Sequence, residues 1–173
     1  EFWQNGNYLY VTAVKDNGIE VLDVSDPANS KPVGKIQDTE KTYLRKPHSI
    51  QFKGNFAFIG STAESAIQVL DISDPTNPIP VASVVDDETN GLKGMHAHAI
   101  YGNYLYAAGT DDNAIEIIDI SDPTNPKSVT TLYDNEEMAL FKPHSIAFYG
   151  NYAYVVGARE GLEGEYSVPD RGR

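Results

Sequence analysis

The sequence contains no cysteine, which excludes disulfides, thiolate metal sites and cysteine nucleophiles. Basic residues are also few, because 13 Lys and Arg stand against 25 Asp and Glu, for a formal net charge of −12. This balance disfavours nucleic acid and anionic lipid as partners and is compatible with cations or basic partners. No apolar run approaches the roughly 18 residues of a membrane span, and no signal peptide is recognisable.

The common catalytic signatures are missing as well. The sequence has no Gly-x-Ser-x-Gly elbow, phosphate-binding loop, His-Glu-x-x-His motif or dinucleotide fingerprint. Ser49 and Ser145 are next to histidines in the chain, but adjacency in sequence is not an oriented triad. We therefore expect a protein that is not an enzyme and that needs no cofactor.

One short stretch recurs with a spacing of 48 residues. Residues 69–75 read Val-Leu-Asp-Ile-Ser-Asp-Pro, and close copies stand at 21–27 and 117–123. A fixed period of this length indicates a repeat architecture. In each copy an Asp can bond its own backbone and a Pro presets a turn, so the stretch predicts the end of a strand and the turn after it.

Each repeat contains four segments that favour short strands. Two β-prone runs flank a Gly-Asn pair, which predicts a tight hairpin because both residues tolerate a positive φ. The Gly-Asn pairs stand at 6–7, 54–55, 102–103 and 150–151. A third, almost continuously apolar run and a shorter fourth run follow each pair. Four-stranded units repeated every 40–50 residues predict an all-β β-propeller, whose blades bury both faces against their neighbours.

The repeated pattern resembles that of a known family. Leu/Ile-Asp-Val/Ile-Ser-Asp-Pro, preceded by Gly-Asn-Tyr-x-Tyr and His-x-Ile, is similar to the LVIVD repeat, and the likeness covers residues 1 to about 160. The resemblance implies a β-propeller in a secreted or cell-surface protein of bacteria or archaea. It implies no catalytic residues. The period here is longer than the usual family unit, and the extra length follows the fourth strand.

The repeats predict a single, partial propeller domain over residues 1–173. We place its blades at about 1–47, 48–95, 96–143 and 144–173, with the last incomplete, so that the chain holds about 3.5 blades. The first unit lacks its first strand in this interpretation. In the fourth, Glu165–Arg171 replaces the expected Asp-Ile-Ser-Asp-Pro signature. Because closed propellers have about 4–8 blades, we expect either an open fragment of a longer protein or a ring completed by another chain.

The long segments between blades are the expected ligand-binding face. They carry acidic pairs and aromatic residues that differ between units, whereas the turns on the opposite face are nearly identical. Variable loops on a rigid scaffold are where binding sites concentrate. The candidate residues for a protein or glycan ligand are Asp38, Glu40, Tyr43, Asp86, Glu88, Asp134, Glu136 and Phe141.

A column of histidines is the candidate metal site. His48, His96 and His144 recur at the start of the innermost strand, so symmetry should array them around the central channel. His98 adds a fourth imidazole that should point the same way as His96. Such a cluster could bind a divalent transition metal, with carboxylates completing the shell. The competing interpretation is that each His bonds a neighbouring loop or blade as a structural feature of the repeat.

The sequence thus predicts a non-enzymatic scaffold for binding or assembly, extracellular or at the cell surface. Two alternatives stay open. One is a metal-assisted hydrolase or lyase that uses the channel histidines and loop carboxylates. The other is an engineered or excised half-propeller that self-assembles.

Overall fold

The computed structural model describes residues 2–157, and nearly all of its regular structure is β-strand. The first sheet contains β1 (Phe2–Asn5), β2 (Tyr8–Ala13), β3 (Gly18–Asp23) and β4 (Lys31–Gln37), with a short 3-10 helix, η1 (Pro27–Asn29), between the last two. The second contains β5 (Pro47–Lys53), β6 (Phe56–Ser61), β7 (Ala66–Asp71) and β8 (Ile79–Val85). The third contains β9 (Met95–Tyr101), β10 (Tyr104–Gly109), β11 (Ala114–Asp119) and β12 (Lys127–Tyr133). The last comprises β13 (Pro143–Tyr149) and β14 (Tyr152–Gly157).

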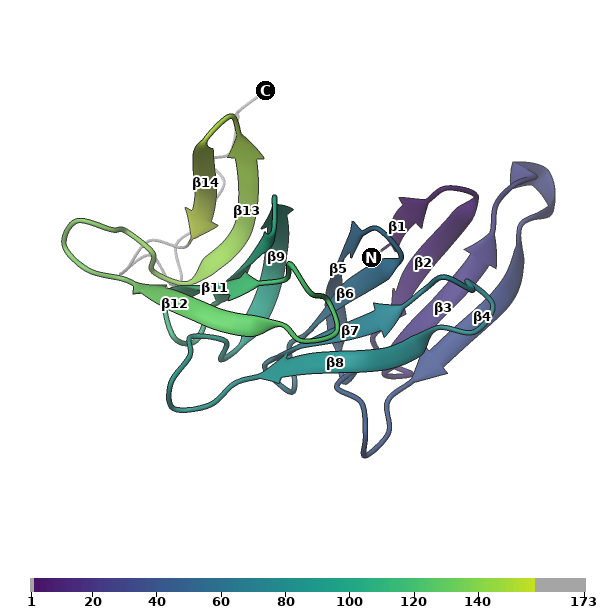
Figure 1. Ribbon diagram of the computed structural model, residues 1–173, viewed down its shortest axis with the longest axis horizontal. Coiled ribbons are helices and arrows are strands. Elements are labelled where there is room, and N and C mark those ends of the chain that lie inside the picture. Colours follow the sequence, from purple (N-terminus) through teal and green to yellow (C-terminus); the bar gives the residue numbers. More distant parts are fainter. Residues whose placement is uncertain (1, 158–173) are drawn as a thin grey trace, which may run out of the picture.

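The strands of each sheet pair in chain order, and every pair is antiparallel. The first strands of successive sheets contact one another, β1 with β5, β5 with β9 and β9 with β13. Figure 1 shows the four sheets following one another along the chain without closing into a ring. This confirms the predicted β-propeller of four-stranded blades, present here as an open segment of about 3.5 blades.

The core lies between the blades. Each of the three interfaces has its own cluster of buried apolar side chains, in which residues from one blade pack against residues from the next. In β7, odd-numbered Ile67 and Val69 face blade 3, while Leu70 faces blade 1. Burial on both faces explains why the third strand is almost continuously apolar instead of alternating.

The repeated Asp-x-Ser-Asp-Pro stretch forms the turn that the sequence predicts. Asp71 Oδ1 accepts a hydrogen bond from Ser73 N at 2.8 Å, and Asp74 Oδ1 accepts one from Thr76 N at 2.9 Å. The other two copies make the same backbone contacts. Hydrogen bonds from Ser73 lower the pKa of Asp71, and those from Thr76 lower the pKa of Asp74. These carboxylates therefore cap backbone donors.

The first blade corrects one prediction. We expected it to lack its first strand, but Phe2–Asn5 pairs with β2 over four residues, from Phe2 opposite Val11 to Asn5 opposite Tyr8. The repeat position of the channel histidine, 48 residues before His48, falls ahead of residue 1.

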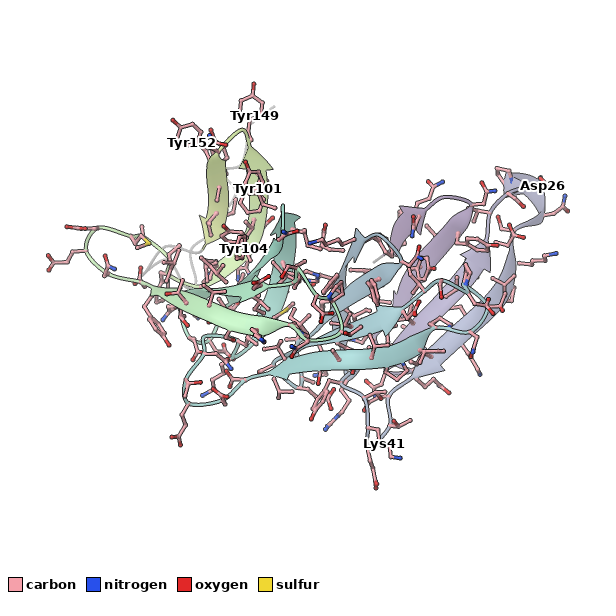
Figure 2. The ribbon with its side chains drawn as sticks, viewed as in Figure 1. Asp26, Lys41, Tyr101, Tyr104, Tyr149 and Tyr152 are labelled. Carbon is pink, nitrogen blue, oxygen red and sulfur yellow. The ribbon has the colours of Figure 1, made fainter. Side chains whose placement is uncertain are left out.

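The fourth blade has two strands among the described residues. The predicted departure at Glu165–Arg171 lies outside those residues. Beside the hairpin, a cavity of about 310 Å³ is lined by apolar side chains that include Ile115, Leu132, Leu140 and Val155. Figure 2 shows Tyr149 and Tyr152 at the outer tip of the hairpin, where they are 78% and 71% exposed.

Within residues 2–157, no helix is long and apolar enough to cross a membrane.

Candidate functional site

Each of the three repeated histidines sits at a β-bulge in the innermost strand. In blade 2, Pro47 pairs with Ser61 and Ser49 pairs with Gly60, so His48 is the extra residue between them. The pairing shifts in the same way around His96 and His144. A bulge leaves one residue unpaired and re-aims its side chain. In a regular strand, successive side chains point to opposite faces of the sheet. Each bulge interrupts this alternation at the histidine.

The three bulged histidines come together as the period predicts. The ring centroids of His48 and His96 are 5.1 Å apart with the rings stacked, and those of His96 and His144 are 5.0 Å apart, edge to face. Desolvation, followed by the charges of His96 and Lys142, lowers the pKa of His144. These imidazoles form a continuous ladder across three blades.

His98 does not join this ladder, contrary to our prediction. Its side chain is only 4% exposed and lies in the interface between blades 2 and 3. Its Nε2 lies 3.1 Å from the carbonyl oxygen of Phe58, and its Nδ1 lies 2.8 Å from Ser49 Oγ. A carbonyl can only accept, so Nε2 donates to Phe58 while Nδ1 accepts from the Ser49 hydroxyl. Burial lowers the pKa of His98 to about 4.

Both nitrogens of His98 are thus engaged, which removes one ligand from the predicted metal site. In the part of the chain that the structure describes, no group of three or more His, Asp or Glu side chains is arranged to hold a metal ion. The channel rings contact one another directly, His48 and His96 stacked and His96 and His144 edge to face. Metal binding by His48, His96 and His144 stays a prediction.

The first acidic residue of the first and third inter-blade loops bonds the backbone of its own loop. Asp38 Oδ1 accepts a hydrogen bond from Leu44 N at 3.0 Å, and Asp134 Oδ1 accepts one from Leu140 N at 2.7 Å. At Asp86, burial and then the charge of Asp112 raise the pKa of the carboxyl group. The loop leucines, including Leu92, are buried in the inter-blade clusters. Asp38 and Asp134 therefore hold the backbone of a buried leucine and are less available to a ligand.

The remaining candidate residues lie on the edge of the propeller formed by the inter-blade loops, the loop rim; the opposite edge, formed by the repeated Ser-Asp-Pro turns, is the turn rim. Glu40, Glu88 and Glu136 are exposed. Tyr43 and Phe141 are half-buried, and Lys142 Nζ lies 5.7 Å from the centre of the Phe141 ring. Figure 2 shows Lys41, in the first of these loops, at the opposite end of the molecule from Asp26 in a repeated turn. The predicted separation of loop rim and turn rim is therefore present.

Sequence analysis overlooked a polar column in the third strands. Gln68 and Glu116 are 2% and 1% exposed, yet they interrupt apolar runs at equivalent positions. Gln68 Oε1 accepts a hydrogen bond from Tyr43 N at 2.9 Å, and Glu116 Oε2 accepts one from Gly91 N at 3.2 Å. A polar residue recurring in phase inside an apolar run is the signal that could have revealed this role.

We expect Glu116→Gln to stabilise the protein by about 1–2 kcal/mol, the scale of relieving one unsatisfied buried polar group. Glu116 Oε1 is buried with no hydrogen-bond partner. In blade 2, by contrast, Gln68 Nε2 donates to Ala82 O at 2.8 Å, and the equivalent carbonyl in blade 3 belongs to Thr130. Urea unfolding of the two proteins measures the difference. The reverse substitution, Gln68→Glu, is the matched control and should destabilise; a gain from both changes would contradict this account.

Comparison with solved structures shows the same fold at low identity. A protein of unknown function from Desulfotomaculum acetoxidans DSM 771 superposes with a TM-score of 0.60 and 16% identity over 73% of this chain. The computationally designed Ika4 protein gives 0.63 and 16% over 90%, and a putative 6-phosphogluconolactonase from Bacteroides fragilis NCTC 9343 gives 0.70 and 12% over 92%. The chain spans 39%, 82% and 49% of these proteins, respectively.

No curated protein matches the chain. The model of the LVIVD repeat matches four segments, residues 2–38, 45–86, 98–133 and 142–163, which include most of the sequence and coincide with the four sheets where the structure describes them. On this evidence the chain belongs to the LVIVD repeat family, as the repeated strand and turn pattern predicts.

Proposed function

We propose that this chain is a non-enzymatic β-propeller segment that serves as a binding and assembly scaffold outside the cell or at its surface. Its ligand is a protein or a glycan, and it takes neither nucleic acid nor a cofactor. Family membership supports the scaffold role. The extracellular setting follows from what the family resemblance implies.

The observation that carries this proposal is the construction of the loop rim. Each loop buries a leucine whose backbone is held by a polar side chain of the same loop, Asp38 in the first, Asn90 in the second and Asp134 in the third. Their exposed residues differ, with Glu40 and Lys41 in the first loop, Glu88 in the second and Glu136 in the third. A constant framework that presents varying side chains is the arrangement found in binding loops.

The charge of the rim indicates the kind of ligand. In the second and third loops the acidic residues outnumber the basic ones, so this part of the rim attracts cationic groups. A basic protein surface or an amine-bearing glycan fits this field. Because exposed charges steer association and are screened by salt, binding should weaken as ionic strength rises.

Protein and glycan arrays probed with the purified chain test the proposal. For a ligand found there, we expect Glu88→Gln and Glu136→Gln together to weaken binding about tenfold, because the two changes remove two rim charges. Asn77→Lys, exposed at the turn rim, changes the charge in the same direction and is the matched control. A well-folded chain that bound nothing, or equal losses from rim and control variants, would count against this function.

A metal-assisted hydrolase or lyase is the second candidate. It is favoured by the ladder of His48, His96 and His144, whose rings lie about 5 Å apart. It is weakened because His98 is buried and hydrogen-bonded, and because Asp38 and Asp134 hold loop backbone. Elemental analysis and zinc titration of the native chain and His96→Ala test it. Absence of His96-dependent metal binding would remove this candidate.

A further inference from the structure

Each of the first two inter-blade loops docks on the blade that follows it through two backbone N–H groups. Tyr43 N donates to Gln68 at 2.9 Å, and Arg45 N donates to Glu64 Oε2 at 3.0 Å. In the next loop, Gly91 N and Lys93 N donate to Glu116 and Asp112 at 3.2 and 3.0 Å. The residue between the two donors of each loop is a leucine, Leu44 or Leu92, which is buried in the interface between blades. The docking is therefore a repeated device with one geometry.

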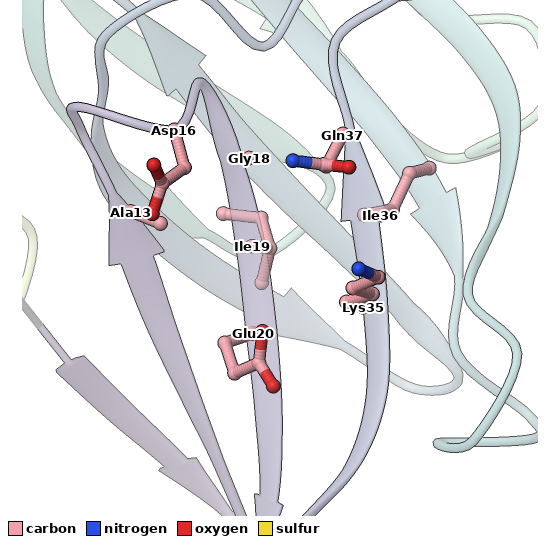
Figure 3. Close-up of a pocket in the computed structure, with 8 residues that line it drawn as sticks. All are labelled: Ala13, Asp16, Gly18, Ile19, Glu20, Lys35, Ile36 and Gln37. Carbon is pink, nitrogen blue, oxygen red and sulfur yellow. The ribbon is translucent and has the colours of Figure 1, made fainter.

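The first blade carries the same two acceptors without a loop. Asp16 is equivalent to Glu64 and Asp112, and Glu20 is equivalent to Gln68 and Glu116, at the 48-residue spacing. Among the described residues, neither carboxylate accepts a hydrogen bond from a loop of this chain. Both line a cavity of about 130 Å³, and Figure 3 shows Asp16 in the turn before β3, Glu20 on β3 and Lys35 on the neighbouring strand.

The apolar face of blade 1 around this cavity corresponds in the repeat to the face of blade 2 that is buried against blade 1. Five residues on the outer face of blade 1 correspond in the repeat to five buried residues of blade 2. The outer residues are Phe2, Leu9, Val11, Leu22 and Val24, and their buried counterparts are Ile50, Ala57, Ile59, Leu70 and Ile72. Phe2 is 71% exposed. Leu9, Val11, Leu22 and Val24 are half-buried. A partly exposed apolar face whose counterpart in the next blade is fully covered is a candidate interaction site.

We propose that the outer face of blade 1 is the docking surface for one further LVIVD-type repeat unit. That unit places two backbone N–H groups of its inter-blade loop on Asp16 and Glu20, and the loop's leucine on the apolar face. The expected loop signature is a leucine followed by Arg or Lys, as at Leu44-Arg45 and Leu92-Lys93. This inference deepens the proposed assembly role and rests on it.

A second copy of the described chain fits this surface poorly. Two of its inter-blade loops already donate both N–H groups to their own blades, and Leu140 of the third is packed in the cluster with Ile146. None of these loops could dock elsewhere without vacating an internal site. A separate repeat unit meets the requirement without that loss.

An N-terminal extension tests the proposal on the full chain. Residue 48 immediately precedes the counterpart of residue 1, so a copy of residues 38–48 fused before residue 1 places the loop in register. We expect the midpoint of thermal unfolding to rise by about 2–4 °C and amide exchange in β3 and β4 to slow by about tenfold. Glu20→Leu should abolish both effects, and Glu20→Gln should keep them, because Gln68 serves this role in blade 2.

Two controls make the outcome decisive. Leu44→Asp within the copied segment should cancel the gain, and Glu20→Leu in the unextended chain should leave stability unchanged, since its partner is not present. A gain that survives Leu44→Asp in the copied segment and Glu20→Leu in the extended chain, or no gain at all, overturns the proposal. Self-association of the native chain, lost in Glu20→Leu, would instead assign the surface to a second copy. A negative ligand array would leave these results intact, so the two proposals fail separately.

Discussion

Acidification from pH 7 to pH 4 should cost the protein about 3 kcal/mol through His98 alone, since one pKa unit corresponds to about 1.4 kcal/mol. The folded-state pKa of about 4 lies below the ordinary 6.5 because the ring is buried. Between these values the unfolded chain binds a proton that the folded chain excludes. The stability due to His98 is therefore complete above about pH 6.5 and is lost as the pH falls through 4. Urea unfolding at several pH values measures this loss.

The repeat itself supplies the matched control for this experiment. Where Ser49 meets His98 between blades 2 and 3, the equivalent residues between blades 3 and 4 are Ala97 and Ile146. The double variant Ser49→Ala/His98→Ile should therefore fold and lose the His98 part of the pH dependence. Exposed aspartates contribute equally to both proteins and cancel in the comparison. An unchanged slope between pH 6.5 and 4 would contradict the assignment of a buried neutral imidazole.

Leu92→Ala should destabilise the protein by about 2–5 kcal/mol, the range for truncating a buried leucine. Leu92 is 0% exposed and packs against residues of both blades 2 and 3. Its loss leaves a cavity in the only apolar layer between them, so the change weakens the interface as well as the loop. Chemical unfolding followed by fluorescence and circular dichroism gives the free energy of unfolding.

Leu140→Ala is the comparison that isolates the packing effect. Leu140 holds the same position in the repeat but borders the open cavity of about 310 Å³ beside the two-stranded blade. Its surroundings are incompletely packed, so we expect less than half the cost of Leu92→Ala. Equal losses at the two positions would show that the loop backbone, and not inter-blade packing, determines the effect.

Most of the architecture could be predicted because its signals are local and repeated. Gly-Asn hairpins, apolar third strands and Ser-Asp-Pro turns each depend on a few adjacent residues, and phased recurrence makes every signal stronger. The exception was β1, where Phe2–Asn5 forms a strand too short for its pattern to be recognised. The candidate site was less predictable, because the partners that dock the loops and hold His98 lie 19–49 residues apart in the chain.

The sequence by itself determined the 48-residue period, the four-stranded blade, the two distinct rims and the alignment of His48, His96 and His144. Only the tertiary structure decided that His98 turns into a blade interface, because the bulge at His96 breaks the alternation that would have kept both rings on one face. It also decided that Asp38 and Asp134 serve their own loops, and that Glu20 is an acceptor without a donor. The His98 contacts join residues 40 and 49 positions apart on neighbouring blades, and the contacts of Asp38 and Asp134 require their loops to fold back over six residues. Neither arrangement follows from adjacent residues alone.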